Sequence, residues 1–401
     1  MFRYYDLAFS SVASKLEKRN NCLMTTLNSA SRDARGLYIH IPFCVKKCAY
    51  CDFYSLPGRS NLISPYIDAL FTEALPYRGL RFKTLYIGGG TPSLLGAEVI
   101  TKLLNGLRDI FDLSNLVEAT IEVNPESATM AFLAAAKKSG INRVSIGVQS
   151  LSEAELKSVG RVHSAEQSLF ALAHADATGF NEISADVIVG LPGQSWGSLA
   201  KTLRFSTRFD VKHLSLYCLS LEHGTPLAEN PPSNLPDDDM QAELFEKACQ
   251  ILSKSGFEHY EISNFARPGH ESKHNLNYWR GGEYLGLGPS AASHLKGKRF
   301  KNKNDLCAYL VNPAGQIEDE ETLSAREKAG EEAMLRLRLL NEGFDIKELS
   351  DKFEEKNTKA LAERLRKLAA EGLLINEDSK YQLPPEYVLT CNPILARVIG
   401  E

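Results

Sequence analysis

Short apolar segments typical of β-strands alternate with segments of helical spacing over the first half of the chain, and this alternation restricts the possible folds most. The predicted strands, rich in β-branched and aromatic residues, cover 37–41, 84–87, 119–123, 143–148, 183–189 and 213–219. The predicted helices between them cover 65–77, 98–110, 128–139, 165–178 and 196–207. Such alternation is typical of a parallel sheet with helical crossovers, and six strands predict an open or partial α/β barrel.

The second half of the chain has no such alternation. A proline-rich, acidic stretch at 226–239 marks a break, a helix is predicted over 240–255, and an aromatic, glycine-rich stretch follows. In the last part, leucines at helical spacing precede the sequence EGLLINEDSKYQL, which predicts a short hairpin. We therefore expect an unstructured N-terminal extension (1–36), a barrel (37–225), an added α+β segment (226–315) and a small C-terminal winged-helix-like helical domain (316–401).

The charge of the chain argues against nucleic acid as a partner. The whole chain carries a net charge of −4, and the segment 316–401 holds 13 basic and 19 acidic residues. A module that binds duplex DNA is normally basic, so we interpret the acidic C-terminal domain as a structural or protein-contact module. The chain also lacks an apolar run of the roughly 20 residues that a membrane span requires.

The first 36 residues hold six basic and three acidic residues together with several serines and threonines. A disordered tail, an extension upstream of a true start at Met24, and an organelle-targeting peptide all fit this composition. The other cysteines are scattered through a long chain, which indicates a reducing compartment rather than a disulfide framework. We expect a cytoplasmic protein, with organelle targeting as the alternative.

Three cysteines, Cys44, Cys48 and Cys51, lie within eight residues just after the first predicted strand. Thiolates are soft ligands that suit zinc or iron–sulfur centres. A structural zinc site usually closes with four protein ligands, and His40 is the local candidate for the fourth. Three cysteines on a loop suit a [4Fe–4S] cluster in which one iron is open to a substrate or cofactor. The spacing favours the cluster and leaves zinc as the alternative.

Glycines and polar residues stand at the ends of the next predicted strands. The glycines of GGGTP, 88–92, let a ligand approach the backbone closely, and a carboxylate such as Glu122 can accept hydrogen bonds from ribose hydroxyls. Each residue alone also fits an ordinary structural role. Because the carboxyl ends of parallel strands meet at one edge of a sheet, we expect the set to form one pocket. The candidates are Gly89, Gly90, Thr91, Glu122, Gln149, Arg161 and Asp186.

The spacing Cys-x3-Cys-x2-Cys, with Tyr50 just before the last cysteine, resembles the signature of the radical S-adenosylmethionine (SAM) superfamily. The resemblance implies a [4Fe–4S] cluster held by Cys44, Cys48 and Cys51, whose open iron chelates the amino and carboxylate groups of SAM. It also implies that Tyr38 lies beside the cluster, that Tyr50 packs near the adenine, and that the seven pocket candidates contact SAM.

From Tyr38 to about Ala292, the chain resembles the oxygen-independent coproporphyrinogen III oxidase family, in which Ser220 and Ala292 match weaker pocket positions. The decarboxylases of that family carry a fourth cysteine two residues after the third, where this chain has Phe53 in the sequence CDF. The HemW-like haem chaperone branch carries CDF and the motif His-Asn-x-x-Tyr-Trp, which occurs here as HNLNYW. The resemblance implies a protein that passes haem to acceptor proteins, with respiratory and iron-storage proteins as candidates.

Three functions follow from these patterns. The first is a haem chaperone with an iron–sulfur cluster and exchangeable SAM. His274 of HNLNYW is a weak candidate for its haem ligand. His274 equally fits a hydrogen-bond network that joins the C-terminal part to the barrel. The second is an enzyme, the radical SAM decarboxylase of coproporphyrinogen III, against which Phe53 argues. The third is a zinc-stabilised DNA-binding regulator, which the acidic C-terminal domain disfavours.

Overall fold

The computed structural model describes residues 35–206 and 208–400. The predictions made for the extension 1–36 therefore lie, up to residue 34, outside the described residues. The division of the chain into four segments with the bounds given above stays a prediction.

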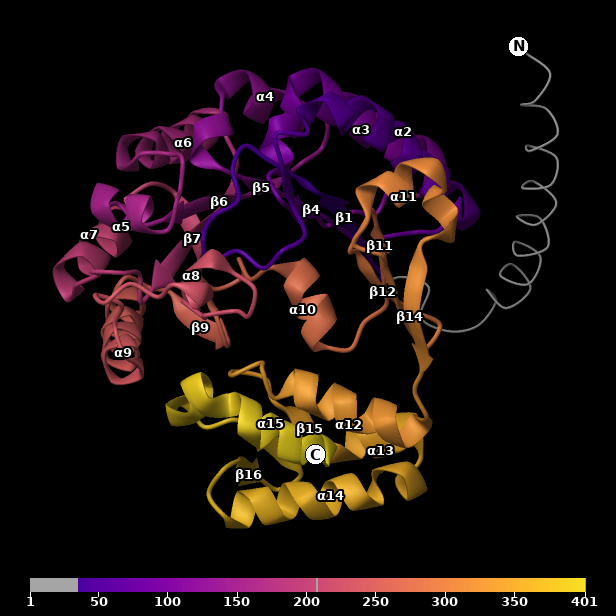
Figure 1. The fold of residues 1–401 in the computed structure, drawn as a ribbon. Helices are drawn as coiled ribbons and strands as arrows, with labels where there is room; N and C mark the ends of the chain where they lie inside the picture. Colours follow the sequence, from indigo (N-terminus) through magenta and orange to yellow (C-terminus); the bar gives the residue numbers. More distant parts are fainter. Residues whose placement is uncertain (1–34, 207, 401) are drawn as a thin grey trace.

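A twelve-stranded sheet forms the centre of the molecule, in the order β14-β13-β12-β11-β1-β4-β5-β6-β7-β8-β10-β9 (Figure 1). Its middle six strands run parallel to one another and confirm the strands expected from the sequence to within a few residues. They are β1 (Gly36–Ile41), β4 (Thr84–Gly89), β5 (Glu118–Val123), β6 (Arg143–Gln149), β7 (Glu182–Val189) and β8 (Val211–Cys218).

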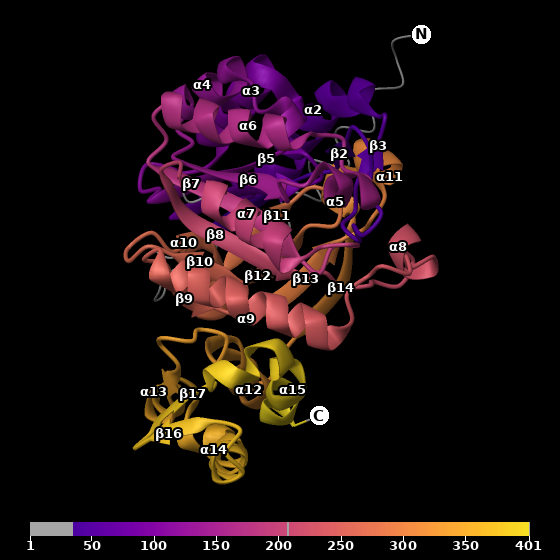
Figure 2. The ribbon, with the colours of Figure 1, turned by 90° about the vertical axis from the view of Figure 1, so that its left-hand side faces the viewer.

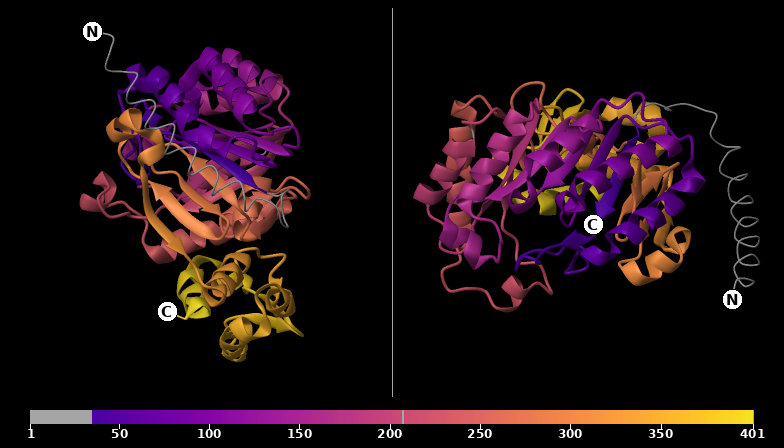
Figure 3. Two further views of the ribbon diagram at one scale, coloured as in Figure 1. Left: turned by 90° about the vertical axis from the view of Figure 1, so that its right-hand side faces the viewer. Right: turned by 90° about the horizontal axis from the view of Figure 1, so that it is seen from above.

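One further parallel strand and five antiparallel strands extend this group on its two sides, so the sheet has two free edges and the barrel stays open. β11 (Tyr284–Leu287) pairs parallel with β1 and leads to three further strands, whereas two strands lie beyond β8. The added strands are β12 (Ala292–Leu295), β13 (Lys298–Asn302), β14 (Ile317–Thr322), β10 (Asn264–Ala266) and β9 (Glu258–Glu261). The expected partial barrel with an added α+β segment is confirmed (Figure 3).

Helices cover the outer face of the parallel strands, as Figure 2 shows. A short 3₁₀ helix, Leu75–Tyr77, follows α2 (Ile63–Ala74) and carries a proline at its second position. The first predicted helix also ends at residue 77. The outer helices are α2 (Ile63–Ala74), α3 (Gly96–Ile110), α4 (Met130–Lys138), α5 (Glu153–Ser158), α6 (Ala165–Ala177), α7 (Trp196–Ser206) and α9 (Asp238–Lys254). Shorter elements are β2 (Phe43–Cys44), β3 (Leu56–Pro57), α8 (Pro226–Glu229), α10 (Lys273–Trp279) and α11 (Leu306–Val311).

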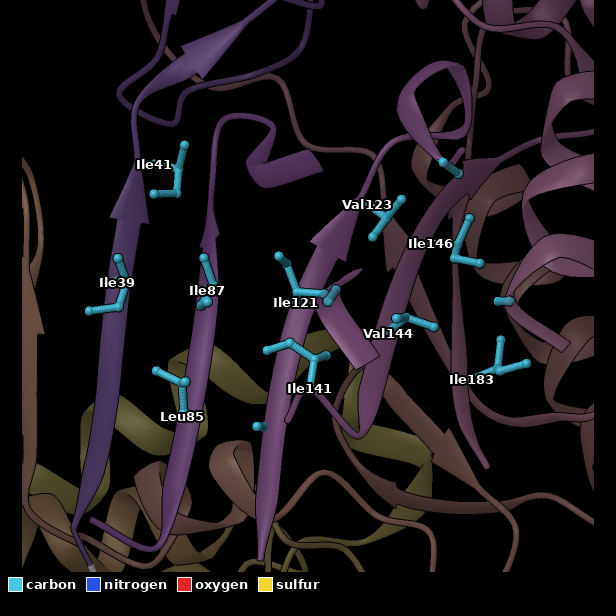
Figure 4. Close-up of a cluster of buried hydrophobic side chains, with 14 of the residues drawn as sticks. Ile39, Ile41, Leu85, Ile87, Ile121, Val123, Ile141, Val144, Ile146 and Ile183 are labelled. Atoms are coloured by element: carbon cyan, nitrogen blue, oxygen red, sulfur yellow. The ribbon is translucent and has the colours of Figure 1, made fainter. Parts of the chain in front are cut away.

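Side-chain alternation along the parallel strands separates an apolar outer layer from a polar interior. Ile39, Ile87, Ile121, Val144 and Ile183 are completely buried and belong to one apolar cluster, which includes residues of the covering helices (Figure 4). Burying one such side chain stabilises the fold by about 1.5–3 kcal/mol. Because successive side chains of a strand point to opposite faces, the residues between these apolar positions face the inside of the barrel.

The C-terminal part has its own apolar core and confirms the expected winged-helix-like domain. It contains α12 (Ala325–Arg336), α13 (Ile346–Phe353), α14 (Glu355–Ala370) and α15 (Cys391–Ile399), with a sheet in the order β15 (Phe344–Asp345), β17 (Lys380–Gln382) and β16 (Ile375–Glu377). The predicted helical leucines Leu361, Leu365 and Leu368 are buried in this core. None of the helices formed by the described residues has the length and apolarity needed to cross a membrane.

The helix α10, which carries the HNLNYW motif, lies between the barrel and the C-terminal domain (Figure 1). The Leu340 amide donates to the Tyr260 carbonyl at 3.0 Å, and the Arg338 guanidinium lies over the Trp279 ring, 5.4 Å from its centre. A small apolar cluster that contains Leu276 and Leu339 fills the space between the two parts. The motif therefore contributes directly to the contact between barrel and C-terminal domain.

Candidate functional site

A cavity of about 450 Å³ opens at the carboxyl ends of the parallel strands. This size is typical of sites for small molecules. The three cysteines of the loop after β1 line the cavity together with eight of the nine predicted cofactor contacts, which are Tyr50, Gly89, Gly90, Thr91, Glu122, Gln149, Arg161 and Asp186. Residues from five parallel strands and from the loops beyond their carboxyl ends therefore meet at one place, as expected for a fold of this class.

The loop from Cys44 to Leu56, called the cluster loop below, is held by backbone hydrogen bonds to several parts of the fold. The two-residue strands β2 and β3 pair at its two ends. In its middle, the Ala49 amide donates to the Val159 carbonyl at 3.0 Å, and the Leu227 amide donates to the Ala49 carbonyl at 2.9 Å. These bonds fix the backbone that carries the cysteines without using their side chains.

Hydrogen-bond donors lie next to two of the cysteine sulfurs. Thr91 Oγ1 donates to Cys44 Sγ at 3.5 Å, and Arg161 Nη1 donates to Cys48 Sγ at 3.6 Å. Such donors can stabilise the negative charge on the sulfur of a cluster-bound cysteine, and thiolates are the ligands of iron–sulfur clusters. Burial raises the pKa of the third thiol, Cys51, to about 11, against the opposing effect of Lys47. Among the residues that the structure describes, no three His, Cys, Asp or Glu side chains are gathered for a single metal ion.

Gly90 supports the cluster loop at very close range. Its amide donates to the Ile41 carbonyl at 2.8 Å, and a Cβ at this position would lie 2.6 Å from the Phe43 carbonyl oxygen and 3.0 Å from Cys44 Sγ. Any side chain would therefore push the loop and its first cysteine away from the strand end. This backbone cradle fits a bulky group bound through the cysteines.

We expect Gly90→Ala to lower the free energy of unfolding by about 1–3 kcal/mol and to reduce the bound iron, because the added methyl group overlaps the Phe43 carbonyl. Chemical unfolding and iron analysis of the purified variant test this. Gly197→Ala is the control, since its Cβ would meet only Ser195 Oγ at 3.7 Å. Equal iron content and stability in the two variants would contradict the expected clash.

Two half-buried carboxylates, Glu122 and Asp186, form part of the inner wall of the cavity. Glu122 accepts from the Tyr86 hydroxyl at 2.8 Å and from the Gly89 amide at 3.0 Å. Burial, together with the nearby charge of Asp186, raises the pKa of Glu122 to about 7. Burial likewise raises the pKa of Asp186 to about 6, although Ser145 donates to its carboxylate at 3.0 Å. Such paired acceptors in a partly dry cavity can bind hydroxyl groups or a positively charged ligand.

Arg161 connects three strand ends around the cavity. Its Nη2 donates to Asn124 Oδ1 at 2.9 Å and to the Gly147 carbonyl at 3.1 Å, and Asn124 Nδ2 donates to Thr91 Oγ1 at 3.0 Å. Gln149, at the end of β6, has a positive φ of 62°, a conformation that costs a non-glycine residue about 1–3 kcal/mol. Strained backbone of this kind persists where the surrounding structure enforces it, often at binding sites.

The predicted cofactor contact Tyr38 does not line the cavity. It stands in the middle of β1, its hydroxyl lies 3.0 Å from His40 Nδ1, and its ring stacks on Tyr86 with the centres 6.2 Å apart. Tyr38 therefore supports the cavity wall through Tyr86, its partner on the neighbouring strand β4. Of the two weaker predicted positions, Ser220 lines the cavity, whereas Ala292 lies in β12 and is not part of the wall formed by the described residues.

The histidine of the HNLNYW motif is enclosed at the opposite ends of the strands. His274 has no exposed surface, its Nδ1 lies 2.8 Å from Thr84 Oγ1, and its Nε2 lies 2.8 Å from the Tyr278 hydroxyl. Its ring stacks on Tyr86, with the centres 5.2 Å apart, and burial lowers its pKa to about 3. Glu118 accepts from the His274 amide at 3.0 Å and so fixes the start of α10. This placement matches the hydrogen-bond network considered as the alternative role of His274.

The structure adds cavity residues that the sequence reasoning missed. Tyr86, Asn124, Ser145 and Tyr217 all line the cavity. Strand alternation could have found Tyr86, because it stands between the buried Leu85 and Ile87 and must face the interior. The sequence pattern alone does not show how deep in the barrel such a residue lies.

Comparisons with known proteins agree with this geometry. Models of the radical SAM superfamily and of the HemN C-terminal domain match residues 38–206 and 323–386. A haem chaperone HemW from Lactococcus lactis is 35% identical over 350 residues, which are 86% of this chain and 92% of the relative. A haem chaperone HemW from Mycobacterium tuberculosis is 36% identical over 378 residues, 91% of this chain and 95% of the relative.

Among solved structures, coproporphyrinogen III oxidase (HemN) from Escherichia coli, a radical SAM enzyme, is similar with a TM-score of 0.82. The match has 24% sequence identity and covers 92% of this chain and 91% of that chain. The similarity extends over the barrel, the added segment and the C-terminal domain, and it shows a common fold.

Proposed function

Because the chain belongs to the HemW family of radical SAM proteins, we propose that it binds haem and transfers it to acceptor proteins. The observation that carries the proposal is the cluster loop. Its three cysteines line the cavity, and the position two residues after Cys51 is held by Phe53, which is 64% exposed. A decarboxylase of the related oxidase family has a fourth thiol there, and an exposed phenyl ring cannot replace it.

In this proposal Cys44, Cys48 and Cys51 hold a [4Fe–4S] cluster, and the inner wall binds SAM. The cluster, when bound, supplies an open iron site for the amino and carboxylate groups of SAM and a source of electrons. The side chains around it have separate tasks. Thr91 and Arg161 stabilise negative charge on the sulfurs, and the backbone at Gly90 leaves room for the loop.

The carboxylates of the inner wall would orient the SAM ribose. Glu122 is held by Tyr86 and the Gly89 amide, so its remaining lone pairs can accept from ribose hydroxyls. Tyr50 and Gln149 line the same space and would enclose the adenine and the rest of the ligand. Whether SAM is cleaved or only retained is a separate question, which product analysis answers.

The test of the function is a haem titration of anaerobically purified, cluster-reconstituted protein. About one haem per chain, with about four iron and four sulfide, is the expected result. Transfer is then measured by mixing the haem-loaded protein with haem-free respiratory or iron-storage proteins. Absence of haem binding would overturn the chaperone function. Formation of protoporphyrinogen IX from coproporphyrinogen III, in the presence of SAM and a reductant, would replace the chaperone by the enzyme. We place the protein in the cytoplasm, where thiols stay reduced.

We expect SAM affinity to rise with pH in a way that depends on Glu122. A folded-state pKa of about 7 means that Glu122 is mostly protonated at pH 6 and mostly ionised at pH 8. If the ionised form is the better ribose acceptor, the ratio of SAM affinities at pH 8 and pH 6 should be about tenfold larger in the wild type than in Glu122→Gln. Calorimetric titration of both proteins measures the ratio, and the variant corrects for the titration of SAM itself. Identical ratios would show that Glu122 does not contact SAM.

A further inference from the structure

Apolar side chains stand in solvent at the rim of the cavity, outside its polar inner wall. Phe53 lines the cavity and is 64% exposed, and Val45, on the same cluster loop, is 52% exposed. On the segment after β8, Leu221 is 42% exposed between Ser220 and Glu222, which both line the cavity. Exposed apolar residues that share one rim, rather than being scattered singly, indicate a surface that receives an apolar ligand.

Two adjacent lysines of the cluster loop bring positive charge to this rim. Lys46 and Lys47 line the cavity and are exposed, and within the described part of the chain neither is paired with a carboxylate. Two acidic residues, Asp52 and Glu222, also line the cavity. An anionic ligand therefore gains binding free energy at this rim only when its acid groups lie at the lysines and its apolar part covers the remainder of the rim.

One exposed histidine, His223, lies next in sequence to a residue of the cavity rim. All nine histidines of the chain are described, and His223 alone is exposed, with no hydrogen bond to its ring. It directly follows Glu222 of the cavity wall and precedes α8, whose Leu227 amide donates to Ala49 of the cluster loop at 2.9 Å. The segment that carries His223 therefore crosses beside the cluster loop, as Figure 1 shows for α8.

We propose that haem docks on this rim, with Phe53 against the face of the porphyrin, Lys46 and Lys47 at its two propionates, and His223 as a ligand of its iron. Haem is a flat apolar ring with two carboxylates on one edge, so its chemistry matches one exposed ring and two adjacent ammonium groups. Histidine is a common ligand of haem iron. This inference rests on the proposed function and gives it a location, since the rim leaves the inner wall free for SAM.

The experiment is a haem titration of the full-length, cluster-reconstituted protein followed by its Soret absorbance. Phe53→Ser is expected to weaken haem binding about tenfold, corresponding to the loss of one buried aromatic contact. Phe170→Ser is the matched control, because Phe170 is 53% exposed on α6, on the outer face of the barrel. Equal affinities of the two variants, with wild-type binding intact, would overturn the site and leave the chaperone function standing. No binding by the wild type would overturn the function itself.

The lysines and the histidine have separate readouts. The double variant Lys46→Glu, Lys47→Glu should weaken haem binding about tenfold or more but bind haem dimethyl ester as the wild type does, because the ester has no charged propionates. Equal loss for haem and ester would overturn the propionate contact. His223→Ala should shift the Soret band of bound haem, whereas His294→Ala, a half-buried histidine of β12, should not. An unchanged spectrum in His223→Ala would overturn the ligand assignment.

Discussion

Replacing Cys48 with alanine should give a folded protein that has lost nearly all of its iron and acid-labile sulfide. Three thiolates are the protein ligands available in the cluster loop, and a [4Fe–4S] cluster with one open iron has no spare ligand. The variant also removes the sulfur that receives the Arg161 hydrogen bond at 3.6 Å, so the guanidinium stays buried beside an empty position. Loss of the cluster is therefore the largest single effect expected in this molecule.

Iron and sulfide analysis after anaerobic reconstitution measures this effect, together with the brown absorption of the cluster. Cys307→Ala is the matched control, because Cys307 is exposed on α11 near Tyr54 of the cluster loop but does not line the cavity. The control should retain the full iron content. A Cys48→Ala protein as brown as the wild type would contradict the assignment of Cys48 as a ligand.

Replacing His274 with alanine should destabilise the protein by about 2–4 kcal/mol while leaving the Soret spectrum of bound haem unchanged. The side chain is completely buried, so its removal leaves a cavity. It also leaves Thr84 Oγ1 and the Tyr278 hydroxyl without their partner, and each buried polar group left unpaired costs about 1–3 kcal/mol. The stacking contact with Tyr86, which donates to Glu122, is lost as well.

Urea unfolding of wild type and variant gives the change in free energy, and a haem titration below the unfolding transition gives the spectrum. His223→Ala serves as the stability control, because an exposed side chain contributes little to folding. A stable His274→Ala protein that has lost haem binding would restore His274 as the haem ligand. The expected result assigns the motif HNLNYW to the structure that joins barrel and C-terminal domain.

These two residues also show how far the sequence can be interpreted. Cys48 could be proposed as a metal ligand from spacing, with a cluster favoured over zinc, because three cysteines in a loop after a strand have few chemical uses. His274 could not, because a motif shows that a residue matters but not whether it faces a ligand or the interior. Only the packing of α10 against the amino ends of the strands showed that both ring nitrogens are occupied.

The sequence by itself determined the class of fold and the edge of the sheet at which the chemistry lies. Strand and helix periods are local properties, so the six parallel strands and their helices were predicted to within a few residues. The location of chemistry at the carboxyl ends of parallel strands then placed Gly90, Glu122 and Asp186 in one cavity. This rule follows from the direction of the strands, so it can be applied to a sequence before any distance in the structure is known.

The tertiary structure alone decided which side chains reach the cavity. Tyr38 and Tyr86 are paired in register on neighbouring strands, yet only Tyr86 lines the cavity. Gly36 pairs with Tyr284, so two neighbouring strands of the sheet come from segments that lie far apart in the sequence. Depth in a barrel depends on strand tilt and on contacts between distant segments, which no local pattern contains. For the same reason, the exposed rim formed by Phe53 and the segment after β8 could be found only in three dimensions.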